Sequence, residues 1–268
     1  MIGARRRQEI RRLVEQSGYA EARQLAHQLG VDVSTIRRDL DALSRQGVVQ
    51  RTHGGALPAP GGEPLDLPYA LRRNERVAAK QAIAAYAASL ISDGDSLVLD
   101  SGSTTYALAE AIAGRRKLTV ATNDLRIAHH LAERGGVHLL VSGGQLIDSV
   151  FTLVGPAALA SLSGMQVDWA FLGADAVDVE AGVTNRNTVE VGLKQAMLAA
   201  AARKVLLADS EKFGRRALAH VVAITEFDCI VTDDELDLPI RPAYGKTLVC
   251  APLSEPVAAG GSADGRAC

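Results

Sequence analysis

The sequence predicts two units of different fold class: a small, mainly helical unit at the N-terminus and a larger α/β unit after it. Two amphipathic helical segments flank Gly30, a Pro- and Gly-rich stretch follows at residues 56–68, and short apolar runs then alternate with helical segments. These patterns are typical of a helical motif, a linker and a largely parallel sheet. We therefore expect a first domain at residues 1–57, a linker at 58–69, an α/β domain at 70–251 and a disordered tail at 252–268.

The N-terminal unit contains two helices joined by a glycine turn. Apolar residues recur at helical spacing between residues 21 and 29, and Gly30 permits a sharp turn after them. The next helix carries VSTIRRDL at residues 33–40, with Asp32 or Ser34 as its N-cap. Its two faces differ in polarity, with Ile36, Leu40 and Leu43 facing inward and Ser34, Arg37, Arg38, Asp41 and Arg45 facing outward.

A basic, glycine-containing hairpin is expected after the second helix, because Gly47 precedes a short apolar strand and RTHGGA follows at residues 51–56. In this order the elements form a winged helix-turn-helix, which places the start of its second helix at base edges in the major groove. Arginine suits that position because its planar guanidinium bonds guanine O6 and N7 together. The alternative is a solvated amphipathic helix whose Arg–Asp pairs meet no ligand. The ordered set of elements favours DNA binding.

The charge of the chain is divided unevenly between the two units. Residues 1–55 hold ten Arg and no Lys against six Asp or Glu, which gives +4, and since the whole chain carries −2, residues 56–268 carry −6. A basic N-terminal unit on an acidic body attracts phosphates at one end only. An arginine cluster near the N-terminus either contacts DNA phosphates or forms the solvent-exposed face of the first helix. Its members are Arg5, Arg6, Arg7, Arg11 and Arg12.

Composition indicates a globular cytoplasmic protein. The hydrophobic fraction of 47% suffices for a packed core, and we see neither a run long enough to span a membrane nor a signal peptide. The three cysteines, Cys229, Cys250 and Cys268, are far apart and form neither metal-ligand spacing nor an expected disulfide framework. The histidines also lack ligand spacing. We expect no metal site and no cofactor.

Beyond the linker the pattern predicts strands at residues 96–99, 118–121, 137–141, 169–172, 205–208 and 229–231. Helices are expected at residues 71–91, 105–112, 125–134 and 189–201. Such alternation predicts a largely parallel sheet with helices on both faces. Ligands of open α/β sheets bind at the carboxyl ends of the strands, so the residues that follow each strand are the candidate site.

The first strand ends in a stretch suited to an anion: Asp100, Ser101, Gly102, Ser103, Thr104 and Thr105. Gly102 permits a tight turn, the hydroxyls donate hydrogen bonds, and the helix start adds free N–H groups and a positive dipole end. The stretch matches neither GxxxxGK[ST] nor GxGxxG, so ATP and NAD are not indicated. The alternative is a hydroxyl-rich helix cap without a ligand.

Later strand ends add further polar residues and glycines. Thr122 and Asn123 follow the second strand, Gly143 and Gly144 the third, Asp175 the fourth and Lys212 the fifth. In a parallel sheet we expect Asp100, Asn123, Asp175 and Lys212 to converge on one rim. A carboxylate such as Asp175 binds sugar hydroxyls, and Lys212 offers a charge for phosphate. Each residue taken alone also fits a local cap or a solvated side chain.

The N-terminal pattern and these strand-end motifs together resemble the DeoR-type bacterial transcriptional regulators. The motifs are VSTIRRDL, a glycine before a short strand, the R-x-HGGA wing, D-x-G-[ST]-T-T, TN, GG, D-x-x-F-x-G and DSxKFG. The resemblance extends over nearly all of residues 1–235. The resemblance implies that Ser34, Thr35, Arg37 and Arg38 lie at the groove. It also implies that Arg51, His53 and Gly54 lie against the DNA backbone or the minor groove.

For the second domain the resemblance implies a fold similar to ribose-5-phosphate isomerase and a phosphorylated sugar, or a close relative, as effector. It suggests that Glu190 and Lys194 border the pocket, although a surface salt bridge at this spacing is as plausible. Gly173, Ala174 and Asp175, with Val177 and Asp178, depart from many members, which leaves the sugar specificity open.

The function that we expect is sequence-specific operator binding by a repressor of sugar-metabolism genes, modulated by a phosphorylated sugar in the second domain. One winged module offers a small interface, so we expect a homo-oligomer, a dimer or a tetramer, on double-stranded operator DNA. The alternative is a phosphosugar isomerase-like enzyme with an appended DNA-binding module, since a carboxylate, a lysine and a phosphate cradle suffice for proton transfer. The complete winged pattern favours a regulator that is not an enzyme.

Overall fold

The computed structural model describes residues 3–45, 48–52, 54–58, 69–147 and 150–253. The N-terminal elements are α1 (Gly3–Ser17), β1 (Ala20–Glu21), α2 (Ala22–Leu29), α3 (Val33–Arg45), β2 (Val49–Arg51) and β3 (Gly55–Pro58). Gly30 ends α2 with φ of 63°, a left-handed conformation that glycine adopts without a steric penalty. The core between the helices contains Ile10, Val14, Leu25, Ile36 and Leu40, each at most 1% exposed. The predicted winged helix-turn-helix is confirmed.

The beginning of the proline-rich stretch belongs to the wing and not to a linker. Ala56 pairs with Ala20 on one side of β3 and with Arg51 on the other, and it is fully buried. The structure differs at both ends of the linker expected at residues 58–69, because Pro58 pairs with Val49 in the wing and Tyr69 begins α4. Residues 59–68, the rest of the expected linker, lie outside the described residues.

The single helix expected at residues 71–91 is divided into α4 (Tyr69–Asn74) and α5 (Val77–Ser89). Arg76 lies between them in the left-handed region with φ of 52°. Its guanidinium bonds the Ser210 hydroxyl at 2.7 Å and the buried Asp233 carboxylate at 2.9 Å. These tertiary contacts explain the break, because they hold Arg76 in a conformation that a continuous helix excludes.

The larger unit is built on a seven-stranded sheet whose strand pairs are all parallel. Its order is β15-β14-β12-β9-β4-β5-β6. The strands are β4 (Ser96–Leu99), β5 (Leu118–Thr122), β6 (Val137–Val141), β9 (Val167–Gly173), β12 (Ala201–Leu207), β14 (Cys229–Asp233) and β15 (Leu248–Ala251). All six predicted strands are present, and β15 was not predicted. The predicted α/β class is confirmed.

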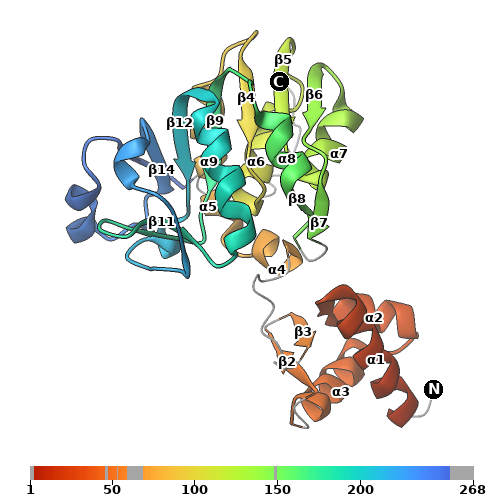
Figure 1. Ribbon diagram of the computed structural model, residues 1–268. Coiled ribbons are helices and arrows are strands. Elements are labelled where there is room, and N and C mark those ends of the chain that lie inside the picture. The colour runs from red at the N-terminus through yellow and green to blue at the C-terminus, as the bar shows by residue number, and fades with distance from the viewer. Residues whose placement is uncertain (1–2, 46–47, 53, 59–68, 148–149, 254–268) are drawn as a thin grey trace, which may run out of the picture.

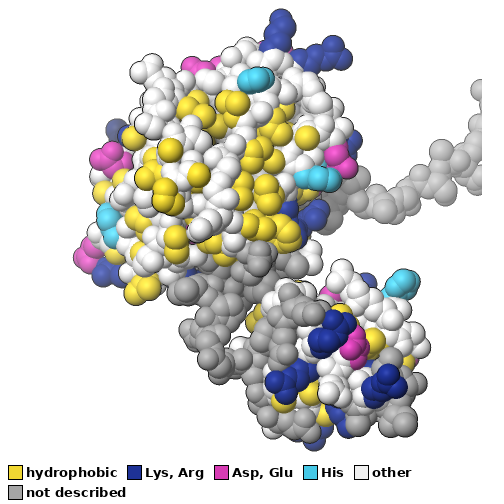
Figure 2. Space-filling view, turned by 45° about the vertical axis from the view of Figure 1, so that its right-hand side comes forward, with side chains coloured by type: hydrophobic (Ala, Val, Ile, Leu, Met, Phe, Trp, Pro, Cys, Tyr) yellow, Lys and Arg dark blue, Asp and Glu magenta, His cyan; other side chains and the backbone are white. Residues whose placement is uncertain are grey.

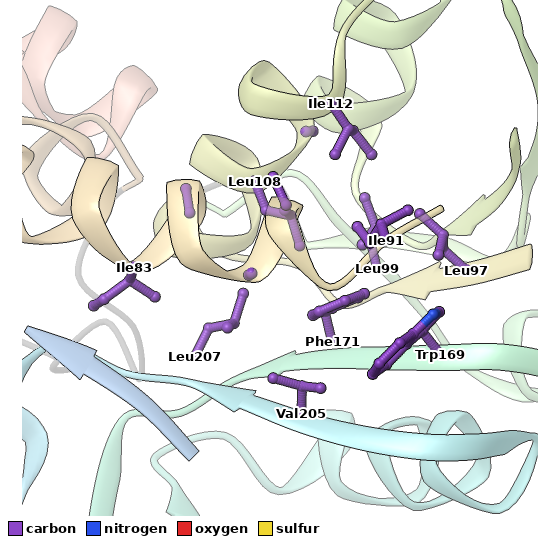
Figure 3. Close-up of a cluster of buried hydrophobic side chains, with 14 of the residues drawn as sticks. Ile83, Ile91, Leu97, Leu99, Leu108, Ile112, Trp169, Phe171, Val205 and Leu207 are labelled. Carbon is purple, nitrogen blue, oxygen red and sulfur yellow. The ribbon is translucent and has the colours of Figure 1, made fainter. Parts of the chain in front are cut away.

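Helices cover both faces of this sheet (Figure 1). α5, α6 (Ser103–Ile112) and α7 (Leu125–Arg134) pack on one face, while α8 (Pro156–Leu162) and α9 (Val191–Ala199) pack on the other. Figure 3 shows the first of these cores, where Ile83 of α5 and Leu108 of α6 lie over Phe171 and Leu207 of the sheet. The helix expected at residues 189–201 is shorter than predicted, because a 3-10 turn, η1 (Thr188–Glu190), precedes α9 and β12 begins at Ala201.

Smaller elements complete the larger unit. A hairpin is formed by β7 (Gln145–Ile147) and β8 (Thr152–Val154), and an antiparallel sheet by β10 (Ala176–Asp178), β11 (Gly182–Asn185) and β13 (Ala219–Val222). Further 3-10 turns are η2 (Ser210–Lys212), η3 (Ile224–Glu226) and η4 (Leu238–Tyr244). None of these elements was predicted from the sequence.

Candidate DNA-binding surface and effector cavity

The helix α3 presents its polar side to solvent. Ser34, Arg37 and Arg38 are exposed, and Thr35 is partly exposed. Asp32 is the N-cap, because its carboxylate accepts a hydrogen bond from the Ser34 backbone N–H at 2.7 Å. Hydrogen bonds from Ser34 lower the pKa of Asp32, which keeps the cap ionised. The groove-facing residues implied by the resemblance therefore share one accessible face.

A buried carboxylate, missed by the sequence analysis, fixes α3 on α1. Asp39 is 4% exposed and accepts from Arg6 Nε at 2.5 Å and from Arg7 Nη1 at 3.3 Å. Arg12 pairs instead with Glu9 in its own helix. At least Arg6 and Arg7 of the N-terminal cluster thus position the recognition helix. The signal was available: residue 39 falls on the inward face with Ile36 and Leu43, where an acid needs a partner.

The wing is joined to α3 by Arg51. Its Nε lies 2.9 Å from Asp41 Oδ1, and its Nη1 donates to the Gly55 carbonyl at 3.0 Å. Gly54 is exposed, and its carbonyl accepts from the Ala22 N–H at 2.9 Å. His53 lies outside the described residues. In this state Arg51 holds the wing against the recognition helix.

The second candidate site lies where the order of the parallel strands reverses. β4 is the first strand of the sheet, β5 and β6 follow on one side of it, and β9, β12, β14 and β15 follow on the other. A crevice opens at such a switch point, outside the carboxyl ends of the strands. A cavity is found there, lined by residues that follow β4, β9 and β12, by residues of α4 and α5, and by residues of β11, η1 and α9.

Part of the predicted anion cradle lines this cavity: Ser101, Gly102, Ser103 and Thr104. Thr105 is fully buried, and its hydroxyl donates to the Gly102 carbonyl at 3.0 Å. Thr105 therefore fixes the turn at the start of α6 without lining the cavity. One wall of the cavity is the N-terminal end of α6, where the backbone N–H groups of the first turn and the helix dipole favour an anion.

Asp100 lies beneath the cavity and not on its rim. It is 2% exposed, its Oδ2 accepts from the Gly173 N–H at 3.0 Å, and it forms an ion pair with Lys194. Lys194 Nζ also donates to the Gly173 carbonyl at 3.1 Å. Burial alone lowers the pKa of Lys194, but Asp100, helped by Glu190 and Asp175, raises it overall, so the ammonium is retained.

Three predicted effector-binding residues from other elements line the cavity: Asp175, Lys194 and Lys212. Asp175, after β9, lines it and accepts from the Arg186 N–H at 2.9 Å, and Lys212, in the turn after β12, lines it as well. Glu190 also lines it and accepts from Asn185 Nδ2 at 3.0 Å. Asn185 was not predicted.

Asn123, Gly143 and Gly144 are not among the residues that line the cavity. The β7–β8 hairpin occupies the space at the ends of β5 and β6. The Leu153 N–H of this hairpin donates to the Asn123 carbonyl at 2.8 Å, and Asn123 Nδ2 donates to the Leu153 carbonyl at 3.3 Å. A Cβ at Gly144 would lie 2.4 Å from the Val154 carbonyl oxygen, so this glycine allows the hairpin to approach. The predicted convergence therefore holds for one part of the rim only.

Three cationic side chains that the sequence analysis missed also line the cavity: Arg72, Arg76 and Lys80. Lys80 is 6% exposed, and its Nζ donates to the carbonyl oxygens of Arg72 and Glu75 at the end of α4. Burial lowers the pKa of Lys80 to about 8. A single lysine in the alanine-rich stretch at residues 77–89 was the available signal.

The described residues contain neither a membrane-spanning helix nor a cluster of metal-binding side chains. No helix in that part of the chain is long and apolar enough to cross a membrane. Nor does it contain a group of three or more His, Cys, Asp or Glu residues arranged to hold a metal ion. Cys229 and Cys250 are free thiols, and Cys268 lies outside the described residues.

A winged helix-turn-helix joined to an α/β domain defines the chain as a DNA-binding regulator. A family model described as "DeoR-like helix-turn-helix domain" matches residues 6–59, and one described as "DeoR C terminal sensor domain" matches residues 75–234. The chain belongs to the DeoR family of transcriptional regulators, as the sequence motifs predicted.

Relatives in this family are named as regulators and not as enzymes. The chain is 34% identical to the putative aga operon transcriptional repressor of Escherichia coli, over 85% of this chain and 86% of the relative. It is 34% identical to the glycerol-3-phosphate regulon repressor of Haemophilus influenzae, over 85% and 89%. It is also 34% identical to the HTH-type transcriptional regulator GlpR of Haloferax volcanii, over 90% and 94%.

Solved structures include distant matches to the α/β fold. The match to ribose 5-phosphate isomerase A of Neisseria gonorrhoeae covers 51% of this chain and 53% of the isomerase chain, with 16% identity and a TM-score of 0.36. The match to the ribose 5-phosphate isomerase of Methanocaldococcus jannaschii covers 50% of this chain and 53% of the isomerase chain, with 18% identity and a TM-score of 0.38. This likeness is too weak to support any statement about activity.

Proposed function

We propose that the chain is a repressor whose operator binding is modulated by a phosphorylated sugar held in the cavity at the β4–β9 switch point. Residues 1–57 bind double-stranded operator DNA in the cytoplasm, and residues 70–251 sense the effector. The observation that carries the proposal is the convergence of the α6 N-terminus with Lys212, Arg72 and Lys80 on one cavity. Helix N-terminal N–H groups and ammonium and guanidinium donors are the groups that hold phosphate esters.

The names of relatives support the class of effector and the class of target genes. Two of the proteins above are named for an aga operon and for a glycerol-3-phosphate regulon. A phosphorylated sugar or polyol fits the cavity chemistry, because carboxylate and amide oxygens at Asp175, Asn185 and Glu190 accept hydrogen bonds from hydroxyls.

The α4–α5 turn is the segment that we propose to carry the signal. The turn and its two helices follow residues 59–68, and they supply Arg72 from α4, Arg76 from the turn and Lys80 from α5 to the cavity. An anion that bonds Lys80 competes with the carbonyl oxygens of Arg72 and Glu75, which Lys80 holds in the free state. Effector binding thereby alters the end of α4. A tenfold change in operator affinity requires a coupling free energy of only about 1.4 kcal/mol.

We also propose that the protein binds DNA as a homo-oligomer, a dimer or a tetramer, because one winged module offers a small interface. Apolar surface supports association. β6 is an edge strand of the sheet, and Leu140, Val141 and Leu146 are exposed on β6 and β7. Figure 2 shows hydrophobic side chains gathered on one face of the larger unit. Light scattering on the purified protein measures the oligomeric state.

The effector proposal is tested by thermal unfolding of the purified protein with a panel of sugar phosphates and their unphosphorylated counterparts. A compound present at about 100 times its dissociation constant stabilises the fold by about 2.7 kcal/mol, which is readily detected as a rise in Tm. We expect the rise with phosphorylated compounds only. If no phosphorylated compound raises Tm, the sensor proposal fails while DNA binding stands.

A further inference from the structure

The two walls of the cavity carry different charges. One wall comes from the sheet face covered by α5 and α6, and it contains Arg72, Lys80 and the N-terminal turn of α6. Lys212 lies within electrostatic range of Lys80 and extends this wall. With Arg76, this wall has four cationic side chains against three carboxylates, Glu75, Asp209 and Glu211, so its net charge is 4 − 3 = +1.

The opposite wall comes from β9, β11 and the start of α9, and it is acidic. It contains Asp175, Asn185 and Glu190. Its cation, Lys194, is 3% exposed and is held by the Asp100 carboxylate and the Gly173 carbonyl. Among the described lining residues of this wall, no other cation is present to meet a second phosphate.

Asn185 gives this wall an acceptor that needs a donor. Its Nδ2 donates to Glu190 Oε2 at 3.0 Å, and a carboxylate cannot donate, so the amide orientation is fixed. The Asn185 Oδ1 is left buried without a hydrogen-bond partner among the described residues, and the side chain is 2% exposed. A buried acceptor without a donor is unfavourable by about 1–3 kcal/mol. A hydroxyl group supplies the donor, whereas a phosphate dianion supplies none.

We infer that the cavity accepts a sugar or polyol that is phosphorylated at one end only, with its phosphate on the α5–α6 wall and its hydroxyls on the wall of Asp175, Asn185 and Glu190. A bisphosphate is rejected, because its second phosphate would face carboxylates in a partly dehydrated site. The inference rests on the proposed effector site and narrows it to monophosphates.

The test is calorimetric titration of the full-length protein with hexose and pentose monophosphates and with bisphosphates of the same sugars, for example fructose 6-phosphate and fructose 1,6-bisphosphate. We expect the best monophosphate to bind at least about tenfold more tightly than its bisphosphate, a difference of about 1.4 kcal/mol. In the double variant Asp175→Asn, Glu190→Gln this ratio is expected to narrow at least about threefold, because the repulsion is removed while acceptor oxygens remain.

The control variant Glu133→Gln removes an exposed carboxylate of α7 that does not line the cavity, and we expect it to leave the ratio unchanged. The Tm without ligand shows that each variant is folded. Equal affinity for a monophosphate and its bisphosphate, or an unchanged ratio in the folded double variant, overturns the inference but not the effector proposal. A protein that binds none of these phosphates overturns the effector proposal itself.

Discussion

Replacing Arg37 and Arg38 by Ala is expected to abolish specific operator binding while leaving effector binding intact. Both side chains are exposed on α3, next to the capped start of the recognition helix. One bidentate arginine–guanine contact contributes about 1–3 kcal/mol of discrimination. Loss of two such contacts lowers operator affinity by about 2–6 kcal/mol, which is at least about thirtyfold. Fluorescence anisotropy with labelled operator and with unrelated duplex measures both affinities.

The matched control replaces two exposed arginines of the sensor domain, Arg134 and Arg215, by Ala. It changes the net charge of the chain by the same amount without touching the recognition helix, so it shows whether net charge alone sets the affinity. We expect the control to retain specific binding. Wild-type operator affinity in the Arg37, Arg38 variant would show that the recognition helix is assigned wrongly.

The largest effect on stability is expected for Lys194→Met. The change removes the ammonium that pairs with Asp100, and Asp100 is 2% exposed with its second hydrogen bond to the Gly173 N–H. Removing one partner leaves the other charge buried and unpaired, which lowers the free energy of unfolding by about 3–5 kcal/mol. Urea denaturation followed by circular dichroism measures this value.

The double variant Asp100→Asn, Lys194→Met provides the control, because it removes both charges and retains an amide that accepts from Gly173. We expect it to be more stable than Lys194→Met alone, since no isolated charge remains. If the double variant were less stable than Lys194→Met alone, so that the losses in free energy of unfolding added, the role of the ion pair as a unit would be contradicted. Far-UV circular dichroism before denaturation shows whether each variant has folded.

The predictions from the sequence were most accurate for elements that depend on residues close together in the chain. The helices and turn of the N-terminal unit depend on Gly30, on the cap at Asp32 and on apolar spacing, all of which lie within a few residues of one another. Six of the seven parallel strands were likewise predicted from apolar runs, and β15 was not. The hydroxyl-rich turn at the start of α6 was predicted for the same reason.

What the sequence did not show depends on contacts between distant residues. The break at Arg76 is held by Asp233, 157 residues away, and periodicity contains no trace of such a contact. Asn123 carries a polar side chain at a strand end like Asp175, but the β7–β8 hairpin closes over it. Lys80 reaches the cavity because α5 packs over the sheet beside α6. Strand order and packing, which neighbouring residues do not determine, decide these placements.

The most direct test of the central claim is operator affinity measured with and without a sugar phosphate that raises the Tm of the protein. The operator is obtained by selection from random-sequence duplexes, and the unphosphorylated sugar serves as the control. At saturating phosphate ester we expect operator affinity to fall at least about tenfold, which corresponds to a coupling free energy of about 1.4 kcal/mol. An operator affinity unchanged by a compound that demonstrably binds would contradict the account, because the cavity would then have no control over the winged helix.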